Sequence, residues 1–141
     1  MKFLDANIFI YAYYKPKKQL TEKEESMKEQ AKEIVRKISE GKEEVITTVV
    51  HISEIVNILK KGLTKDQLTQ TLLGLFMLDN VTISDVTKEA YFAAIALGDD
   101  FKLEPNDALA VDLMRQSEIT EIYSFDEDFD KVDGITRLPL I

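Results

Sequence analysis

The chain has 141 residues, 45% of them apolar and 31% charged, and its 26 acidic side chains outnumber 18 basic ones, for a net charge of −8. This length predicts a single domain over residues 1–141 that buries roughly two thirds of its unfolded surface. No apolar run approaches the roughly 18–20 residues of a membrane span, the N-terminus lacks a signal-peptide pattern, and the absence of cysteine excludes disulfides and thiolate metal sites. We therefore expect a cytoplasmic protein that does not enter a membrane.

The charge is distributed unevenly along the chain. Residues 1–78 hold 13 bases and 11 acids, whereas residues 79–141 hold 5 bases and 15 acids. A strongly acidic surface normally argues against a nucleic-acid partner, because phosphate binding needs a positive potential. The acidic excess is therefore a solvated surface, a partner site or a cluster of metal ligands.

In the first half of the chain, short apolar runs alternate with helical patterns. Thr21 with Glu24 and Thr64 with Gln67 each fit a capping box at the start of a helix, and Gly41 is a helix stop. The periodicity of apolar residues predicts these elements in chain order: a strand over 2–4, a helix over 6–14, a helix after Thr21, a strand over 44–47, a helix from 48 or 49 to about 61, and a helix lined by Leu68, Leu72, Leu75 and Phe76.

The second half continues this alternation. Asn106, after Pro105, is expected to be the N-cap of a helix. The remaining predicted elements are a strand over 80–83, a helix over 87–101 with Tyr91, Ala94, Ile95 and Gly98 on its packing face, a helix from 105, a strand over 121–125 and a last strand over 136–138. Strands separated by helices indicate a parallel sheet covered on both faces. The predicted fold class is α/β, a three-layer α/β/α sandwich with a central, mostly parallel sheet of four to five strands.

Carboxylates from four separate stretches are expected at one edge of this sheet. In an open parallel sheet, ligands bind beyond the carboxyl ends of the strands. Asp5 ends the first strand, and Glu54 lies in the early turns of the helix that follows the second strand. Asp107 lies in the first turn of the helix before the fourth strand, and Asp126 and Asp128 follow that strand. The topology therefore predicts that these five acids converge.

Crowded carboxylates repel one another, and each disfavours the ionisation of its neighbours. A divalent hard cation relieves that repulsion: Mg²⁺ prefers oxygen ligands and binds a few carboxylates together with substrate phosphates, and Mn²⁺ accepts similar ligands. Such a metal can activate a water and stabilise a leaving oxygen. Hydrolysis of a phosphodiester is the reaction class that best matches these parts, so part of the acidity is the metal site itself.

Four segments in a fixed order carry a specific resemblance across nearly the whole chain: FLDANIFIYA, TTVVHISEIVNIL, EPNDALAVDLM and YSFDEDFDKVDGITRL. The last contains an S/T-x-D-x-D-F pattern, supplied by Ser124, Asp126, Asp128 and Phe129. Each motif alone is weak, but together they resemble the PIN-domain ribonucleases, the family that includes the VapC toxins of toxin–antitoxin pairs.

The resemblance implies a metal-dependent endoribonuclease, of the type II toxin class, whose catalytic acids bind one or two Mg²⁺ or Mn²⁺ ions. These acids are Asp5, Glu54, Asp107 and Asp126, with Asp128 as a further metal ligand. It also implies that Asn7 and Ser124 hold the carboxylates by hydrogen bonds. A homodimer, an RNA substrate and an antitoxin that blocks the acidic cleft are implied as partners.

Basic side chains, which are often found near the site in this family, are sparse here. The candidates for RNA contact interleave aromatic and basic residues shortly after Asp5: Tyr14, Lys15, Lys17 and Lys18. Such a patch can stack bases and contact phosphates. The alternative is a solvated loop whose lysines lay their apolar stems along the surface.

Each acid also has a purely structural interpretation. Asp5 would cap the following helix, Asp107 would compensate a helix dipole, and Glu54 would be a surface glutamate. One of Asp126 and Asp128, which lie in an acid-rich loop, would simply be solvated. One alternative function is a non-catalytic PIN-like module that binds protein or RNA. Another is a phosphohydrolase of the haloacid-dehalogenase type, which needs a second aspartate where the chain has Asn7. The single histidine, His51, falls one helical turn before Glu54 and is expected to be packed or solvent-exposed rather than to act on substrate.

Overall fold

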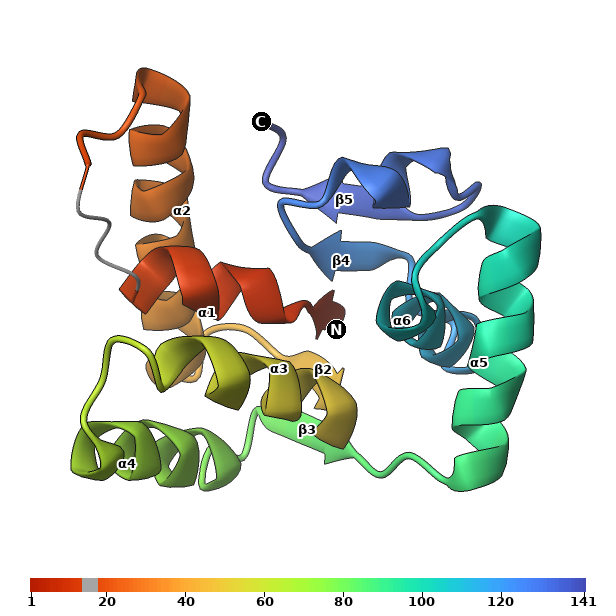
Figure 1. The fold of residues 1–141 in the computed structure, drawn as a ribbon, viewed down its shortest axis with the longest axis horizontal. Coiled ribbons are helices and arrows are strands. Elements are labelled where there is room, and N and C mark those ends of the chain that lie inside the picture. Colours follow the sequence, from red (N-terminus) through yellow and green to blue (C-terminus); the bar gives the residue numbers. More distant parts are fainter. Residues whose placement is uncertain (14–17) are drawn as a thin grey trace.

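The protein is described from a computed structural model, which covers residues 1–13 and 18–141. Five strands form one sheet in the order β3-β2-β1-β4-β5, and every neighbouring pair is parallel (Figure 1). The strands are β1 (Lys2–Leu4), β2 (Val45–Thr48), β3 (Val81–Ser84), β4 (Glu121–Tyr123) and β5 (Thr136–Leu138). The predicted α/β class with a sheet of four to five mostly parallel strands is confirmed.

Helices connect the strands in the predicted order. They are α1 (Ala6–Tyr13), α2 (Glu22–Ser39), α3 (Val49–Leu59), α4 (Lys65–Phe76), α5 (Lys88–Phe101), α6 (Pro105–Gln116) and the short 3₁₀ helix η1 (Glu127–Lys131). Both predicted capping boxes form, because Thr21 Oγ1 accepts from the Glu24 N–H at 3.2 Å and Thr64 Oγ1 accepts from the Gln67 N–H at 3.1 Å. Among the described residues, no helix combines the length and the apolar character needed to cross a membrane.

Side chains alternate between the two faces of the sheet, and each face is covered by helices. Leu4 and Val45 join an apolar cluster with residues of α1, α2, α3 and α4. Phe3 and Ile46, each the neighbour of one of these, join a second cluster with α6 and Phe129 of η1. Because successive side chains of a strand point to opposite faces, the sheet is the middle layer of a three-layer sandwich.

Three predicted details were wrong. Asn106 is not a helix cap: Glu104 is the N-cap of α6, Pro105 follows it, and the Asn106 side chain instead accepts a hydrogen bond from the Tyr91 hydroxyl. Proline suits the first helical position because it has no N–H to leave unpaired, which moves the cap one residue before it. Ile95 and Phe76, expected on packing faces, are 50% and 54% exposed.

The strand order identifies where a ligand would bind. β1 lies at the centre of the sheet, paired with β2 on one side and β4 on the other. The chain leaves β1 toward β2 and β3, then crosses back to β4 and β5, so the order reverses between β1 and β4. Open α/β sheets bind ligands outside the carboxyl ends of the strands at such a reversal. Asp5 and Asp126 follow the ends of these two strands.

Candidate metal centre

Asp5 is held at the carboxyl end of β1 by bonds to its own helix and to β4. Its backbone N–H donates to the Tyr123 carbonyl at 3.0 Å, which extends the pairing of the two strands. One carboxylate oxygen, Oδ1, accepts from the Ala6 N–H at 2.8 Å, and Oδ2 accepts from the Ser124 hydroxyl at 2.6 Å. Asp5 is buried, so its carboxylate has a fixed orientation.

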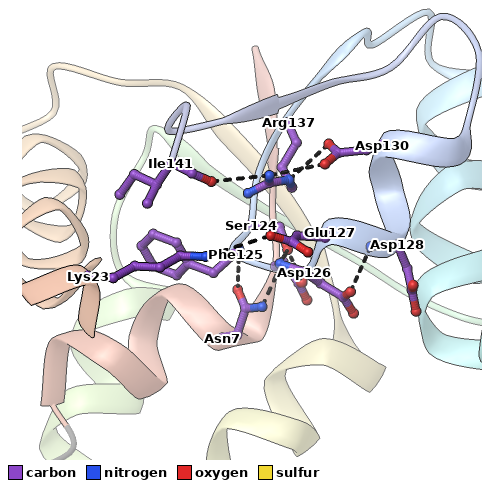
Figure 2. A network of polar contacts seen from close by, with 11 residues as sticks. Asn7, Lys23, Ser124, Phe125, Asp126, Glu127, Asp128, Asp130, Arg137 and Ile141 are labelled. Atoms are coloured by element: carbon purple, nitrogen blue, oxygen red, sulfur yellow. Dashed lines mark hydrogen bonds and ion pairs between the residues drawn. The ribbon is translucent and has the colours of Figure 1, made fainter. Parts of the chain in front are cut away.

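Ser124 connects three stretches of the chain at this point (Figure 2). Its Oγ donates to Asp5, accepts from the Asp126 N–H at 3.0 Å and accepts from Nδ2 of Asn7 at 3.4 Å. The Oδ1 of Asn7 accepts from the Phe125 N–H at 3.2 Å. Ser124 thus bonds a carboxylate directly, whereas Asn7 acts on the site through Ser124 and the Phe125 backbone.

Asp107, Asp126 and Asp128 bring carboxylate oxygens together. One oxygen from each lies within 4.8 Å of those of the other two, a spacing at which all three can bind one cation. Asp126 is the N-cap of η1, where its Oδ1 accepts from the Asp128 N–H at 2.9 Å. Asp107 lies in the first turn of α6, the helix that packs in the apolar cluster of Phe3 and Ile46. Asp5 and Glu54 are not members of this group of three.

Glu54 reaches the same edge from α3. It is half-buried, and its Oε1 is buried without a hydrogen-bond partner among the described residues. Burial raises the pKa of Glu54 above its ordinary value. An orphaned carboxylate oxygen costs free energy unless a cation or a donor satisfies it.

Burial and the crowding of the carboxylates raise the pKa values of two of these acids. Burial raises the pKa of Asp5 to about 6; the Ser124 hydroxyl opposes this rise, and the charges of Glu54 and Asp126 add to it. Burial also raises the pKa of Asp107 far above its ordinary range, and the charges of Asp5 and Asp126 raise it further. Asp5 and Asp107 therefore lie within electrostatic reach of each other and of both Glu54 and Asp126.

The sequence of this chain matches the PIN domain family over residues 2–135. It belongs to the PIN family. The resemblance carried by the four motifs is therefore confirmed. No curated protein matches the sequence.

Solved structures that share this fold include a chain of a toxin–antitoxin complex and a toxin. A toxin–antitoxin complex from Klebsiella pneumoniae aligns with a TM-score of 0.66 and 17% identity, covering 96% of this chain and 96% of that chain. VapC20 of Mycobacterium tuberculosis, a sarcin–ricin loop cleaving toxin, aligns with a TM-score of 0.67 and 19% identity, covering 92% of this chain and 93% of that chain. At these identities the likeness shows a common fold.

His51 lies on α3, one helical turn before Glu54, and its side chain is packed in the interior of this PIN domain. It is fully buried, its ring meets Phe3 edge-on at 5.0 Å, and its Nδ1 lies 2.7 Å from Thr48 Oγ1. Burial lowers the pKa of His51 to about 4, so the ring is neutral at pH 7. Of the two sequence-based expectations, packing is confirmed.

The candidate RNA contacts are only partly described. Tyr14, Lys15 and Lys17 lie outside the described residues, and Lys18 is exposed. One basic residue near the site was missed. Arg137, on β5, has a nearly buried side chain that donates to both carboxylate oxygens of Asp130, at 3.0 and 3.1 Å. The only sequence signal for it is a lone arginine in an acidic stretch.

Proposed function

We propose that this PIN domain is a metal-dependent endoribonuclease, a single nuclease domain over residues 1–141 that hydrolyses phosphodiester bonds of RNA. The proposal rests on one observation above all: carboxylate oxygens of Asp107, Asp126 and Asp128 lie within 4.8 Å of one another, at the edge where β1 and β4 end. Membership of the PIN family adds independent support. The convergence of acids predicted from the sequence indicates the same reaction class, hydrolysis of a phosphodiester.

The residues present suit a divalent cation. An all-carboxylate donor set is what Mg²⁺ and Mn²⁺ prefer, and the orphaned Oε1 of Glu54 and the raised pKa of Asp5 both indicate acids that lack a compensating charge. We propose that Asp107, Asp126 and Asp128 hold one or two such ions, with Asp5 and Glu54 completing the set. The chemistry supplied by a bound ion would be activation of a water and neutralisation of charge on the phosphate.

The chain's own groups orient this centre. Ser124 and the Ala6 N–H fix both oxygens of Asp5, so that its carboxylate does not rotate away from the phosphate. The 3₁₀ turn of η1 fixes Asp126 relative to Asp128. A preorganised set of charges needs little rearrangement when the substrate becomes more negative in the transition state. His51, which is buried and neutral, is not needed as a base.

The toxin role is a further part of the proposal. Both solved structures described above are toxins or contain one, and they have the same fold. We propose that this cytoplasmic chain is the toxin of a type II pair, that it forms a homodimer, and that an antitoxin covers its acidic edge. Tyr14, Lys15, Lys17 and Lys18 remain proposed RNA contacts.

Cleavage of end-labelled single-stranded RNA by the purified protein tests the activity. We expect cleavage with Mg²⁺ or Mn²⁺ and none with EDTA, and a loss of about 100-fold or more in Asp107→Asn, because this change removes one charged ligand. Asp112→Asn is the matched control: it lies on the same helix and outside the acid cluster, so its activity should equal that of the wild type. Equal cleavage by Asp107→Asn, or no Mn²⁺ binding in calorimetry, would favour the non-catalytic module instead.

A further inference from the structure

A second binding element adjoins the acid cluster. A cavity of about 570 Å³ lies between α1 and α2 on one side and η1 with the end of the chain on the other. Its wall includes Asp126 and Asp128, so a molecule in the cavity would lie directly beside the proposed scissile phosphate. The volume falls in the range of sites that bind small organic groups.

The lining of this cavity includes an aromatic and apolar part, here called its floor, formed by Tyr11, Phe125 and Met27. Tyr11 and Phe125 contact each other edge-to-face, with ring centroids 5.0 Å apart and a 65° angle between the ring planes. Met27, buried in the core, lies beside them. A flat ring is the shape that such a floor accommodates best, through contacts with ring edges and faces and with the thioether.

Both basic side chains among the described residues that line the cavity already have acidic partners, so the cavity itself is a poor site for a phosphate. Of the described residues that line it, Lys23 and Arg137 are basic, whereas Glu24, Asp126, Glu127 and Asp128 are acidic. Arg137 is already paired with Asp130 and also donates to the Ile141 carbonyl at 3.4 Å (Figure 2). A phosphate in the cavity would therefore have to separate Lys23 from Glu127 or Arg137 from Asp130. A neutral ring with N–H donors suits the wall better.

A carboxylate acceptor lies at the rim. Glu127 is 70% exposed, and it forms an ion pair with Lys23, 62% exposed, at 3.7 Å across the mouth of the cavity (Figure 2). Exposed ion pairs of this kind contribute at most about 1 kcal/mol. Glu127 can therefore exchange Lys23 for a donor on a ligand at little cost.

We propose that this cavity binds one unstacked base of the RNA substrate, next to the cleaved bond, and that Glu127 selects a base with an exocyclic amino group over uracil. The proposal rests on the proposed ribonuclease function. Single-stranded RNA is recognised by bases that stack on aromatic side chains and bond along their edges. Carboxylates accept from the amino group of cytosine, whereas uracil presents an oxygen there. The acidic lining would also attract a basic protein segment, but the paired rings of Tyr11 and Phe125 favour a flat base as the occupant.

Binding and cleavage are measured separately, so that the two proposals can fail separately. Oligonucleotides that differ only in having cytosine, adenine or uracil at each position are bound in an Asp107→Asn background and cleaved by the wild type. We expect about tenfold weaker binding when uracil replaces the amino-bearing base at one position. Base-selective binding without cleavage would overturn the nuclease function and leave the base site intact.

Substitutions at the rim and the floor identify the cavity as the source of selectivity. Glu127→Gln should reduce the preference to about twofold or less, because an amide can also donate to the uracil oxygen. Glu29→Gln is the control, since it removes the same charge from an exposed position on α2 outside the cavity. Tyr11→Leu, checked for an unchanged fold by circular dichroism, should weaken binding of every base about tenfold.

Three results would overturn the base site. The first is cleavage with no base preference at any position. The second is a preference that survives Glu127→Gln unchanged. The third is a Glu127→Gln protein with unaltered RNA binding but weakened binding of a lysine-rich peptide, which would make the cavity a site for a basic protein segment.

Discussion

The hydroxyl of Ser124 donates to Oδ2 of Asp5 at 2.6 Å across 119 residues of chain, and both residues are buried. The bond exists because β1 and β4 are parallel neighbours, which brings the residues that follow Leu4 and Tyr123 together. It joins the acid at the centre of the sheet to the segment that carries Asp126. The geometry of the candidate metal centre therefore depends on a residue that is not itself an acid.

Replacing Ser124 by alanine should weaken metal binding. The change leaves Oδ2 of Asp5 and the Asp126 N–H without their shared partner, and loss of a group that orients metal ligands typically costs 10–100-fold in affinity. We expect the Mn²⁺ dissociation constant measured by calorimetry to be about tenfold larger. Ser117→Ala, at the exposed C-terminal end of α6, is the control. Unchanged Mn²⁺ affinity in Ser124→Ala would show that Asp5 does not depend on this bond.

Asp5→Asn should stabilise the metal-free protein near neutral pH. The pKa of Asp5 is about 6 in the folded protein against 3.8 for the free side chain, so its contribution to stability is full below pH 3.8 and is lost as the pH rises through 6. A neutral asparagine avoids that loss. The difference between the two pKa values corresponds to about 3 kcal/mol, and the asparagine amide nitrogen cannot accept from the Ser124 hydroxyl, which costs about 1 kcal/mol. We therefore expect Asp5→Asn to be about 2 kcal/mol more stable than the wild type at pH 7.5.

The stability difference should also depend on pH and on metal. It should vanish near pH 4, where Asp5 is protonated, and it should reverse when saturating Mn²⁺ stabilises only the protein that binds it. Urea unfolding in EDTA and in Mn²⁺ measures both. A wild type more stable than Asp5→Asn at pH 7.5 in EDTA would contradict the buried, repelled carboxylate.

Much of this site could be predicted because it follows from topology. Asp5, Glu54, Asp107 and Asp126 lie near strand ends or helix starts, and in a parallel sheet these meet at one edge regardless of how the side chains pack. The role of Asn7 could not be predicted in detail, because its partners Ser124 and Phe125 are more than a hundred residues away.

Other features depend on contacts that no local pattern records. Asn106 has the residue type of a helix cap, yet Pro105 occupies the first helical position. The Asn106 side chain instead accepts a hydrogen bond from the Tyr91 hydroxyl. The cavity beside the acids needs Tyr11 from α1, Met27 from α2 and Phe125 from the loop between β4 and η1. Helical periodicity also placed Ile95 on a packing face, although nothing in the period alone says how wide the buried stripe is.

The only histidine of the chain offers a direct test of how tightly α3 packs against the sheet. His51 is fully buried, and burial lowers its pKa to about 4 from an ordinary value of 6.5. Its contribution to stability is therefore full above pH 6.5 and is lost as the pH falls toward 4, because the unfolded chain takes up the proton first. NMR of the ring Cε1–H, a single resonance in this protein, should show no titration between pH 7 and 5.5. A midpoint near 6.5 would mean that the ring is solvated.

α6, the helix that carries Asp107, packs against α5, and Gly98 of α5 lies against Ala108 of α6. A Cβ at position 98 would come within 2.8 Å of the Leu103 carbonyl oxygen and 3.1 Å of Ala108 Cβ. Gly98→Ala must therefore shift the turn at Leu103 and the first turns of α6 at Ala108, and we expect a loss of about 1–3 kcal/mol in the free energy of unfolding.

Gly74→Ala is the matched control for Gly98→Ala. Gly74 lies inside α4, and a Cβ at this position would have nothing within 4 Å, so alanine there should gain about 0.5–1 kcal/mol through helix propensity. Urea unfolding of the two variants should give free-energy changes of opposite sign, and Mn²⁺ affinity should fall only in Gly98→Ala, because only that change displaces Asp107. If both variants were stabilised, α5 and α6 would not be packed as closely as the structure has them.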